Sequence, residues 1–503
     1  MDPPRLRVVF ARHLASLPGG GYRQVMAKKN KVQRPKARRA RGFPDRSGAE
    51  LVAEREMLER IAQVYESYGF APLATPALEY TDALGKFLPD VDRPNSGVFS
   101  FQDDDEQWLS LRYDLTAPLA RYVAENMDAL PRPFRRYAVG TVWRNEKPGP
   151  GRFREFTQID ADSCFAPPPH ADAEIIMMFV DALAAAGVDA RDVEIRLSSR
   201  KVMTGVLEII GLDPADEARA GTVLRAMDKY DRLGADGVAL LLGEGRKDES
   251  GDFTEGAGLA PGQVDQVLRF MEGADMAAAL AGNATGAEGA AELDAIISTL
   301  AACGYGERVK LDPSVIRGLD YYTGPVFEAA LTFDVENEKG QVVQFGSVGS
   351  GGRYDGLIAR FKGQEVPSVG CSVGVSRLLT ALRSKAALPA AKAPIVVLAL
   401  EEAEMPRYHR MAQALRAEGI AAEVYVGGAG MKAQMRYADK RGAPIVVICG
   451  EDERTHGQVT VKDLRVGKEA SSAIESRDQW TAERPGQETM PEADLVRVVK
   501  ARL

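Results

Sequence analysis

The segment 143–162 carries a row of polar side chains that could bind a charged ligand. If residues 151–162 form a strand, alternate side chains share one face of it. The polar members of that face are Arg154, Gln158, Asp160 and Asp162. Arg144 precedes Gln158 by 14 residues, so two strands joined by a tight loop would place both on one sheet surface. A guanidinium beside amide and carboxylate groups suits a zwitterionic or phosphorylated ligand. Such a row alone is more often a sheet face without a function, so other segments must show whether it belongs to a binding site.

Three other segments carry residues with chemical potential. Asp114 lies where a turn meets a predicted helix, and taken alone it is more typical of a helix N-cap than of a ligand-binding carboxylate. The segment 317–324 combines an arginine and two tyrosines with glycines, which permit a close backbone approach. The segment 346–356 is neither a Walker A loop nor a dinucleotide-binding loop, and its five glycines exceed what one β-bulge requires.

Together these segments resemble the class II aminoacyl-tRNA synthetases, and specifically the histidyl-tRNA synthetases. The matching stretches are Arg144 with residues 151–158 (motif 2), 317–324 and 351–356 (two segments specific to this family), 370–379 (motif 3), and a helix with Pro76 (motif 1). The likeness extends from about residue 41 to the C-terminus. It implies an enzyme that activates L-histidine with ATP and transfers it to tRNA-His, releasing AMP and diphosphate.

The resemblance assigns the catalytic roles to three arginines. Arg144 and Arg317 would contact the α-phosphate and the histidine carboxylate, and Arg377 would lie near the adenine and γ-phosphate. Glu146 matches a further ATP-binding position. Fixed positive charge suits a reaction whose transition state gathers negative charge on phosphoryl oxygens. Mg²⁺ would accompany ATP, whereas the dispersed Cys and His residues indicate no metal site built from side chains.

The same resemblance implies sites for histidine and tRNA. Asp114 and Gln158 would bind the α-amino group, and Asp162 and Tyr322 the two imidazole nitrogens. Other histidine-binding positions implied by the likeness are Leu115, Thr116 and Tyr321, with Arg144 and Arg317. The implied tRNA-binding residues are Lys147, Arg152, Lys432 and Arg436. For the last two, the alternative is a solvated helix face, although Lys and Arg are the usual phosphate partners.

Two departures from the common bacterial pattern affect the expected contacts. Ser376 stands where motif 3 usually has glutamate, which puts in doubt a magnesium or ribose contact there. The motif 2 loop contains Lys147, Pro148 and Gly149, where bacterial relatives commonly carry the Arg-Pro-Gln that senses the extra 5′ guanylate of histidine tRNA. Lysine lacks the planar fork that recognises a base in a bidentate manner. We therefore predict that aminoacylation depends only weakly on this guanylate. The alternative is that backbone amides of residues 149–151 recognise it.

A different function is considered beside this one. A non-catalytic paralogue that binds histidine and regulates ATP phosphoribosyltransferase shares motif 2. Such paralogues typically lack the Arg-Gly-Leu-Asp-Tyr-Tyr segment and the anticodon-binding domain. Both are indicated here by residues 317–322 and by the C-terminal pattern, which favours the enzyme.

The elements that must position these residues predict an α+β fold. We expect a class II catalytic core with an antiparallel sheet over residues 47–197 and 313–384, split by a helical insertion domain over 198–312. Alternating strands and helices from residue 394 to 503 predict a C-terminal α/β anticodon-binding domain with parallel strands. Residues 1–46 are a basic N-terminal extension, either an arm for RNA phosphates or a segment unable to form a core.

Several local elements are also predicted. Ser47 with Glu50 predicts a capping box that starts a helix reaching Tyr68. The apolar stretch 175–188 predicts a buried helix, because it is too short to cross a bilayer. Strands are expected at 324–333 and 342–348, and a helix from about Ser376.

Composition limits the remaining classes. The chain of 503 residues has a net charge of −8, which argues against coating nucleic acid through bulk attraction. No apolar segment suits a secretory leader or a membrane span, so a cytoplasmic protein without membrane contact is expected. Motif 1 implies a homodimer.

Overall fold

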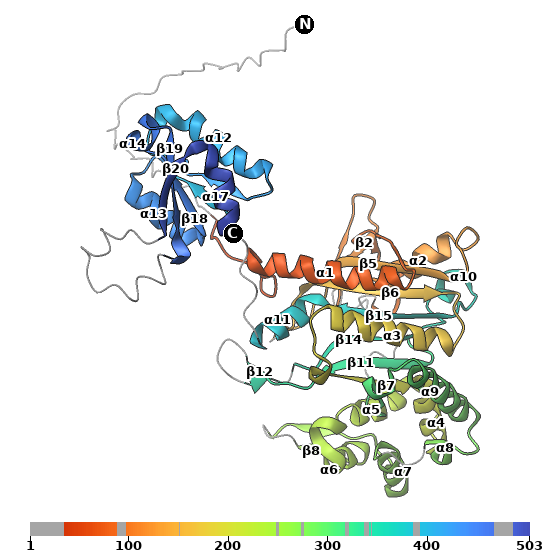
Figure 1. Ribbon diagram of the computed structural model, residues 1–503. Coiled ribbons are helices and arrows are strands. Elements are labelled where there is room, and N and C mark those ends of the chain that lie inside the picture. The colour runs from red at the N-terminus through yellow and green to blue at the C-terminus, as the bar shows by residue number, and fades with distance from the viewer. Residues whose placement is uncertain are drawn as a thin grey trace, which may run out of the picture. The chain divides into compact units, whose positions relative to one another are not determined.

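An eight-stranded sheet forms the centre of the larger part of the chain (Figure 1). The computed structural model describes residues 35–87, 97–149, 151–247, 251–272, 276–316, 321–336, 342–343, 345–385, 393–466 and 486–503. The strands, in their order across the sheet, are β1 (Ala71–Pro72), β5 (Phe134–Trp143), β6 (Glu155–Cys164), β15 (Ser368–Gly374), β14 (Ser347–Arg353), β11 (Pro325–Leu331), β7 (Val193–Ser199) and β10 (Val309–Leu311). The inner strands pair antiparallel, and β1 and β10 pair parallel at the edges.

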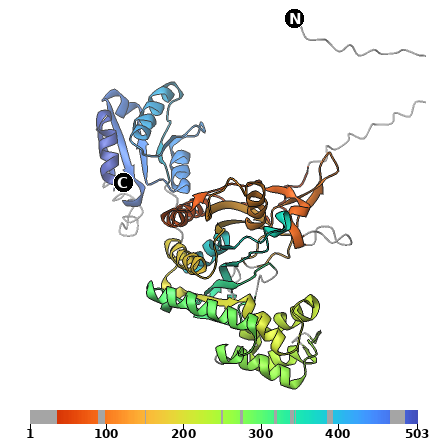
Figure 2. The same cartoon turned by 90° about the vertical axis from the view of Figure 1, so that its right-hand side faces the viewer.

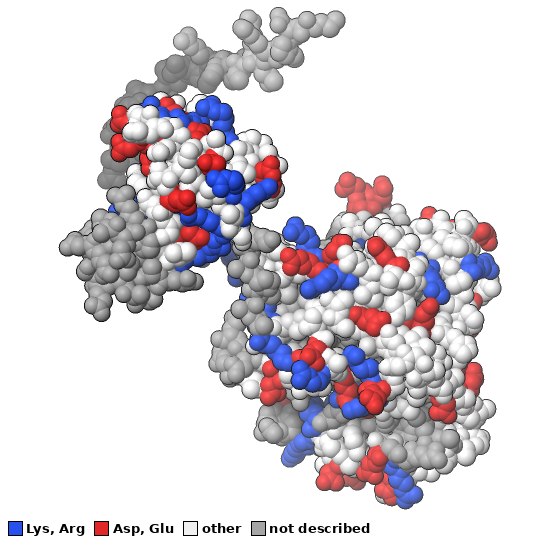
Figure 3. Space-filling model, viewed as in Figure 1, with Lys and Arg blue, Asp and Glu red and all other residues white. Residues whose placement is uncertain are grey.

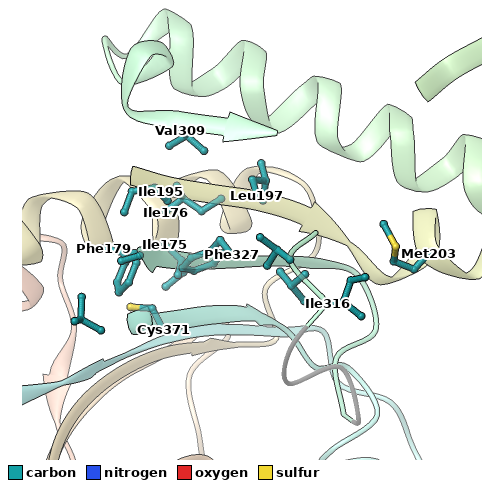
Figure 4. Packing of buried hydrophobic residues seen from close by; sticks show 14 of the residues in the cluster. Ile175, Ile176, Phe179, Ile195, Leu197, Met203, Val309, Ile316, Phe327 and Cys371 are labelled. Carbon is teal, nitrogen blue, oxygen red and sulfur yellow. The ribbon is translucent and has the colours of Figure 1, made fainter. Parts of the chain in front are cut away.

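Two long helices, α1 (Ala49–Ser67) and α3 (His170–Ala185), run along this sheet (Figure 1). The buried helix predicted at 175–188 is confirmed over 175–185, since α3 begins earlier, at His170, and ends at Ala185. Phe179 packs against Phe327 of β11 with ring centroids 5.3 Å apart, and Ile195 and Leu197 of β7 lie in the same apolar cluster (Figure 4). The one charge within the predicted stretch, Asp181, accepts hydrogen bonds from the Tyr68 and Tyr305 hydroxyls.

The start of α1 differs from the predicted capping box. The helix is observed close to its predicted range, but its N-cap is Gly48, with φ of 57° and no side-chain hydrogen bond. The prediction of Ser47 as N-cap was wrong. The chain enters the helix through a residue with positive φ, a backbone conformation that glycine adopts without strain. Leu51, expected on the buried side, is 43% exposed.

The strand predicted at 342–348 was wrong in its bounds, because the structure has β13 at Val342–Val343 and places β14, Ser347–Arg353, within the glycine-rich segment. A Cβ atom on Gly351 would lie 2.3 Å from the Phe327 ring and 2.4 Å from the Gly370 carbonyl oxygen. Glycine usually weakens a strand, but here it permits β14 to lie against a bulky neighbour. The glycines therefore allow close packing within the sheet. They do not mark bulges alone.

A helical layer follows β7 (Figure 1). Its helices are α4 (Arg200–Ile209), α5 (Glu217–Met227), α6 (Tyr230–Leu242), α7 (Pro261–Met271), α8 (Met276–Ala279) and α9 (Ala284–Ala302). A small hairpin joins β8 (Gly245–Lys247) to β9 (Phe253–Glu255). Strand β10, which lies inside the range expected for the insertion, pairs with β7 in the large sheet.

Smaller elements complete this part of the chain. They are α2 (Thr116–Glu125), α10 (Ala359–Lys362), α11 (Val375–Lys385), β2 (Leu78–Tyr80), β3 (Ser100–Gln102), β4 (Trp108–Leu111), β12 (Val335–Glu336) and β13 (Val342–Val343). Strands β2, β4 and β3 form a separate sheet. Helix α11 confirms the helix expected near Ser376.

The C-terminal part is an α/β unit with its own apolar cluster (Figure 2). Its sheet has the order β17 (Ala422–Val424), β16 (Ile395–Val397), β18 (Ile445–Ile448), β19 (Gln458–Asp463) and β20 (Gln487–Pro491). The helices are α12 (Met405–Ala417), α13 (Met431–Arg441), α14 (Glu451–Thr455) and α17 (Leu495–Arg502). The first three strands are parallel, as predicted, whereas β19 and β20 add an antiparallel edge. Over the described parts of the chain, no helix is long and apolar enough to cross a membrane.

Candidate active site

Strands β5 and β6 carry the predicted row of polar side chains. They pair antiparallel, with Gly140 opposite Gln158, Ala138 opposite Asp160 and Arg136 opposite Asp162. Arg144 follows directly after β5. The predicted arrangement of two strands and a connecting loop is therefore confirmed, and it places Arg144 and Gln158 beside one cavity.

This first cavity measures about 380 Å³ and lies over the middle of the sheet. The residues from the motif 2 strands that line it are Arg144, Arg152, Gln158, Asp160 and Asp162. Other predicted residues that line it are Asp114, Thr116, Tyr321, Tyr322 and Arg377. The structure therefore gathers residues from four distant sequence segments around one space.

Asp114 both caps a helix and faces the cavity. Its Oδ1 atom accepts hydrogen bonds from the backbone N–H groups of Thr116 and Ala117, at 3.2 and 2.9 Å, at the start of α2. Burial raises the pKa of this carboxyl, and the Ala117 amide and the Arg144 guanidinium oppose that rise. The two readings of Asp114 are thus compatible, because the residue both bonds the start of α2 and lines the cavity.

The Arg144 guanidinium is held between two aromatic rings. Its Cζ atom lies 4.3 Å from the Tyr113 ring centroid and 5.2 Å from that of Phe156. The Tyr113 hydroxyl in turn donates to Glu146 Oε1 at 3.0 Å. Aromatic faces favour a cation and restrict its orientation, so the planar fork of Arg144 is fixed before a ligand arrives.

Two buried carboxylates lie side by side on β6. Asp160 and Asp162 are each 2% exposed. Asp162 Oδ2 lies 2.7 Å from Arg136 Nη2, and Asp162 Oδ1 accepts a hydrogen bond from the Tyr354 hydroxyl. Burial raises the pKa of Asp160 to about 7, with a further rise from the neighbouring Asp162 carboxylate and an opposing effect of Arg136. The two carboxyl groups of Asp160 and Asp162 thus share one buried cation, Arg136.

The tyrosines of the family-specific segment line the same cavity. The Tyr321 and Tyr322 hydroxyl oxygens are 3.5 Å apart, and their ring centroids are 4.6 Å apart. Leu115 lies differently from the other expected histidine-binding residues: its side chain packs with Ala138 and Val142, and its carbonyl accepts from Arg136 Nη2 at 2.9 Å. Arg317 lies outside the described residues.

A second cavity, of about 460 Å³, adjoins the first. The two share seven lining residues, namely Arg144, Arg152, Gln158, Ser347, Ser350, Ser372 and Arg377. The Arg377 guanidinium donates to the Phe345 carbonyl and lies 5.3 Å from the centroid of that ring. Glu146 lines the second cavity only. Guanidiniums at the junction could therefore contact ligands in both spaces.

Ser376 faces away from these cavities. Its hydroxyl accepts a hydrogen bond from the Thr157 amide at 3.0 Å and donates to Glu54 Oε2 at 3.5 Å. The Thr157 hydroxyl also donates to Glu54 Oε1, at 3.1 Å. In this chain the motif 3 serine therefore ties α11 to β6 and α1, with Glu54 supplying the buried carboxylate.

A third cavity of about 600 Å³ lies between the sheet and the helical layer. Arg152 and Arg377 line it, as they line the first two, and Lys229 and Arg232 extend it toward α6. Lys147 is exposed in the loop between β5 and β6. Cationic side chains thus lead from the junction of the first two cavities toward the helical layer, with Asp228, Glu328 and Asp334 lining the same space.

Lys432 and Arg436 lie in the C-terminal unit on one exposed face of α13. The helix is anchored through buried Gln434, which bonds the Ala399 amide and carbonyl at 2.9 and 2.6 Å. Figure 3 shows Lys and Arg interspersed with Asp and Glu on the face that it displays. Recognition of an anion therefore depends on such local groups.

Three buried residues of the site were not predicted as site residues: Asp160, Arg136 and Tyr354. Asp160 was visible in the sequence as a member of the polar row. Tyr354 lies in the glycine-rich segment, but nothing in that segment alone indicated that its hydroxyl bonds Asp162. Arg136 could have been found only from the strand register that places it opposite Asp162.

Comparison with known proteins gives a consistent result. A family model described as histidyl-tRNA synthetase matches residues 42–378, and one for an anticodon binding domain matches residues 394–502. A histidine–tRNA ligase of Brucella ovis is 56% identical over 485 residues, covering 94% of this chain and 97% of the relative. One from Rhizobium leguminosarum bv. trifolii is 55% identical, covering 94% and 96%. The crystal structure of histidyl-tRNA synthetase from Nostoc sp. PCC 7120 is 28% identical, with a TM-score of 0.69, covering 93% of this chain and all of that one.

Proposed function

Because this chain belongs to the histidyl-tRNA synthetase family and is a histidine–tRNA ligase, we propose that its adjoining cavities hold histidine and ATP, with Arg144 at their junction. The observation that carries this proposal is the shared lining of the two spaces. The first is rich in carboxylates, as an ammonium and an imidazole require. Arg144, Arg152 and Arg377 border both spaces, and the second, which has no aspartate among its described lining residues, suits a triphosphate.

Adenylation then takes place where the cavities meet. A carboxylate oxygen of histidine attacks the α-phosphorus of ATP, and the bond from that phosphorus to the diphosphate oxygen breaks. Arg144, already oriented by Tyr113 and Phe156, stabilises the charge that gathers on the α-phosphate oxygens. Arg317 supplies the second guanidinium, in the role that the family resemblance assigns to it. Preorganised charge needs little rearrangement during the reaction, and no protein nucleophile takes part.

Histidine lies with its ammonium toward Asp114 and Gln158. Gln158 Oε1 is buried and has no hydrogen-bond partner among the described residues, so it offers an acceptor to an N–H donor. The imidazole points toward the end of the cavity formed by Asp162 and Tyr322. A ligand that left these buried groups unpaired would bind poorly.

Mg²⁺ accompanies ATP as part of the substrate. A hard cation takes oxygen ligands, and Glu146 is the carboxylate that lines the second cavity within the described part of the chain. Glu146 is therefore the residue here that would hold a phosphate-bound cation, whose positive charge would add to that of the arginines. Ser376 makes no such contact, because it bonds Thr157 and Glu54.

Transfer requires the tRNA acceptor end to reach the adenylate. The third cavity offers a cationic path through Arg152, Lys229 and Arg232, and Lys147 contacts the acceptor stem. Lys432 and Arg436 bind phosphates at the anticodon end. This assignment gives residues 47–197 and 313–384 to catalysis, 198–312 to the insertion domain and 394–503 to anticodon binding.

The enzyme acts as a cytoplasmic homodimer in this proposal. Exposed apolar side chains on the segment that resembles motif 1 and on the small sheet support a covered surface. They include Leu51, Tyr80, Phe101 and Trp108, which are 43%, 57%, 46% and 45% exposed. Burying such side chains against a second copy removes apolar area from water.

Two arginine variants test the site. Arg317→Ala and Arg144→Ala should each reduce kcat for histidine-dependent pyrophosphate exchange by at least about a hundredfold, roughly 2.7 kcal/mol, with the fold intact. Arg191→Ala is a matched control, because Arg191 is 88% exposed and pairs with Asp189. Near-normal exchange by folded Arg144→Ala or Arg317→Ala would show that the arginine has no catalytic role.

A further inference from the structure

A buried carboxylate of α1 lies behind the first two cavities. Glu54 is 7% exposed and lines none of the three cavities described above. Its Oε1 atom accepts a hydrogen bond from the Thr157 hydroxyl at 3.1 Å, and its Oε2 atom accepts one from the Ser376 hydroxyl at 3.5 Å. A single side chain of α1 is therefore bonded to both β6 and α11.

The two residues that donate to Glu54 each precede a residue that faces both cavities. Thr157 is followed by Gln158 on β6, and Ser376 is followed by Arg377 on α11. Gln158 and Arg377 line the first and the second cavity. Successive side chains of a strand point to opposite faces, so Thr157 is held from behind the sheet while Gln158 faces the ligand. Contacts at Thr157 and Ser376 therefore fix the backbone from which both ligand-facing side chains extend.

A direct hydrogen bond between β6 and α11 completes the set of contacts. The Thr157 backbone N–H donates to Ser376 Oγ at 3.0 Å, so the serine hydroxyl accepts from β6 and donates to α1. Arg46, in the segment before α1, pairs with the Glu54 carboxylate. Hydrogen bonds to an ionised group are stronger than those between neutral groups, and a low local dielectric strengthens them further. The three elements are therefore held together at one point.

The small side chain at position 376 makes this arrangement possible. A glutamate there, as in the usual motif 3 pattern, would place a second carboxylate beside Glu54, and two buried like charges repel each other. Serine instead supplies one hydroxyl that donates to the carboxylate of α1. Glu54 and Ser376 thus fit each other chemically.

We propose that Glu54 is a positioning residue for both substrates, acting on Gln158 through Thr157 and on Arg377 through Ser376. The carboxylate touches neither substrate and takes no part in the reaction. Its effect is on binding, because Gln158 and Arg377 contact histidine and ATP before the reaction begins. The proposal deepens the function given above and rests on the placement of histidine and ATP in the adjoining cavities.

Pyrophosphate-exchange kinetics on folded Glu54→Ala test this role. The variant loses both contacts and should raise the KM for histidine and the KM for ATP by at least about fivefold each. Glu54→Gln should stay within about threefold of wild type in both, because its oxygen can face Arg46 and Ser376 while its amide donates to the Thr157 hydroxyl. A loss of stability alone would lower the melting temperature and leave both KM values unchanged.

Glu50→Gln is the matched control on the same helix. Glu50 pairs with Arg383 of α11 at 3.4 Å, and both side chains are partly exposed. This pair joins the same two helices but has no contact with Thr157 or Ser376 in the described structure. Both KM values of the control should stay within about twofold of wild type.

Changes at the two intermediate residues separate the two effects. Thr157→Val removes the hydroxyl with little change in size and should raise the KM for histidine, whereas Ser376→Ala should raise the KM for ATP. The double variant Glu54→Ala/Ser376→Ala should have a KM for ATP within about twofold of that of Glu54→Ala, since both changes break one contact. Additive increases would overturn the action of Glu54 through Ser376.

Two outcomes distinguish this proposal from the function on which it rests. If wild-type protein shows histidine-dependent exchange and folded Glu54→Ala has wild-type KM values, only the positioning role of Glu54 is wrong. If Glu54→Ala does not fold, wild-type KM values in both Thr157→Val and Ser376→Ala overturn that role. Absence of exchange by wild-type protein would overturn the placement of histidine and ATP as well.

Discussion

The replacement Asp160→Asn should stabilise the folded protein at alkaline pH. Burial raises the pKa of Asp160 to about 7, from an ordinary value of 3.8. The folded state therefore holds this proton more tightly than the unfolded state. The associated stability is present below about pH 4 and is lost as the pH rises through about 7. Asparagine cannot ionise, so the variant does not undergo this loss of stability as the pH rises.

The size of the effect follows from the two pKa values. About three pH units separate them, and each unit corresponds to about 1.4 kcal/mol, giving about 4 kcal/mol in total. Between pH 5 and pH 8 the loss is about 2.5 kcal/mol. The charged and titratable groups that interact with Asp160 include Asp162, Arg136, Arg112, Asp114, Tyr65, Tyr321, Tyr322 and Cys371. All are retained in the variant, so its comparison with wild type isolates Asp160.

Urea unfolding at a series of pH values measures this difference. Trp143 fluorescence is a suitable probe, because Trp143 lies at the end of β5 and donates to Glu155 of β6 at 2.9 Å. The variant should gain about 2 to 3 kcal/mol over wild type between pH 5 and pH 8. A difference in the free energy of unfolding that is constant over this range would contradict the raised pKa of Asp160.

Three further predictions concern other parts of the chain. Deleting residues 394–503 should leave a folded core that activates histidine but charges tRNA poorly, and full charging efficiency in a folded truncated protein would exclude the anticodon role. Histidine tRNA transcripts with and without the extra 5′ guanylate should be charged with similar efficiency, because Lys147 and Gly149 lack a bidentate donor; a drop of a hundredfold or more, roughly 2.7 kcal/mol, would show that the loop still senses it. Gly351→Ala should destabilise the fold by on the order of 2 kcal/mol, because its Cβ would lie 2.3 Å from the Phe327 ring, whereas Gly356→Ala meets no atom within 4 Å and serves as the control in thermal unfolding.

The sequence predicted the parts of the fold that depend on local pattern. Alternation identified the strand with Gln158, and the 14-residue spacing to Arg144 predicted the paired strand before it. Other features depend on distant partners. Strand β10 has only three residues, too few to show an alternation of apolar and polar side chains. It forms a strand because it pairs with the edge of β7.

The composition of the site was predictable to a similar extent. Family motifs indicated which segments surround the cavity, and the structure brings the described ones together. They could not separate Asp160 from Asp162, because the two have the same chemistry and face of the strand. The difference lies in what the neighbouring strands place opposite them, namely Ala138 and Arg136. Only the strand register determines that.

Amino-acid-dependent pyrophosphate exchange, measured with each of the twenty amino acids in turn, tests the central claim most directly. With purified protein and ATP, histidine alone should support exchange, because Asp114, Gln158 and the aspartates of β6 are satisfied together only by an ammonium and an imidazole. Exchange with another amino acid at a comparable kcat/KM would contradict the assignment of this cavity to histidine. Histidine binding without any exchange would contradict the role of Arg144 at the junction.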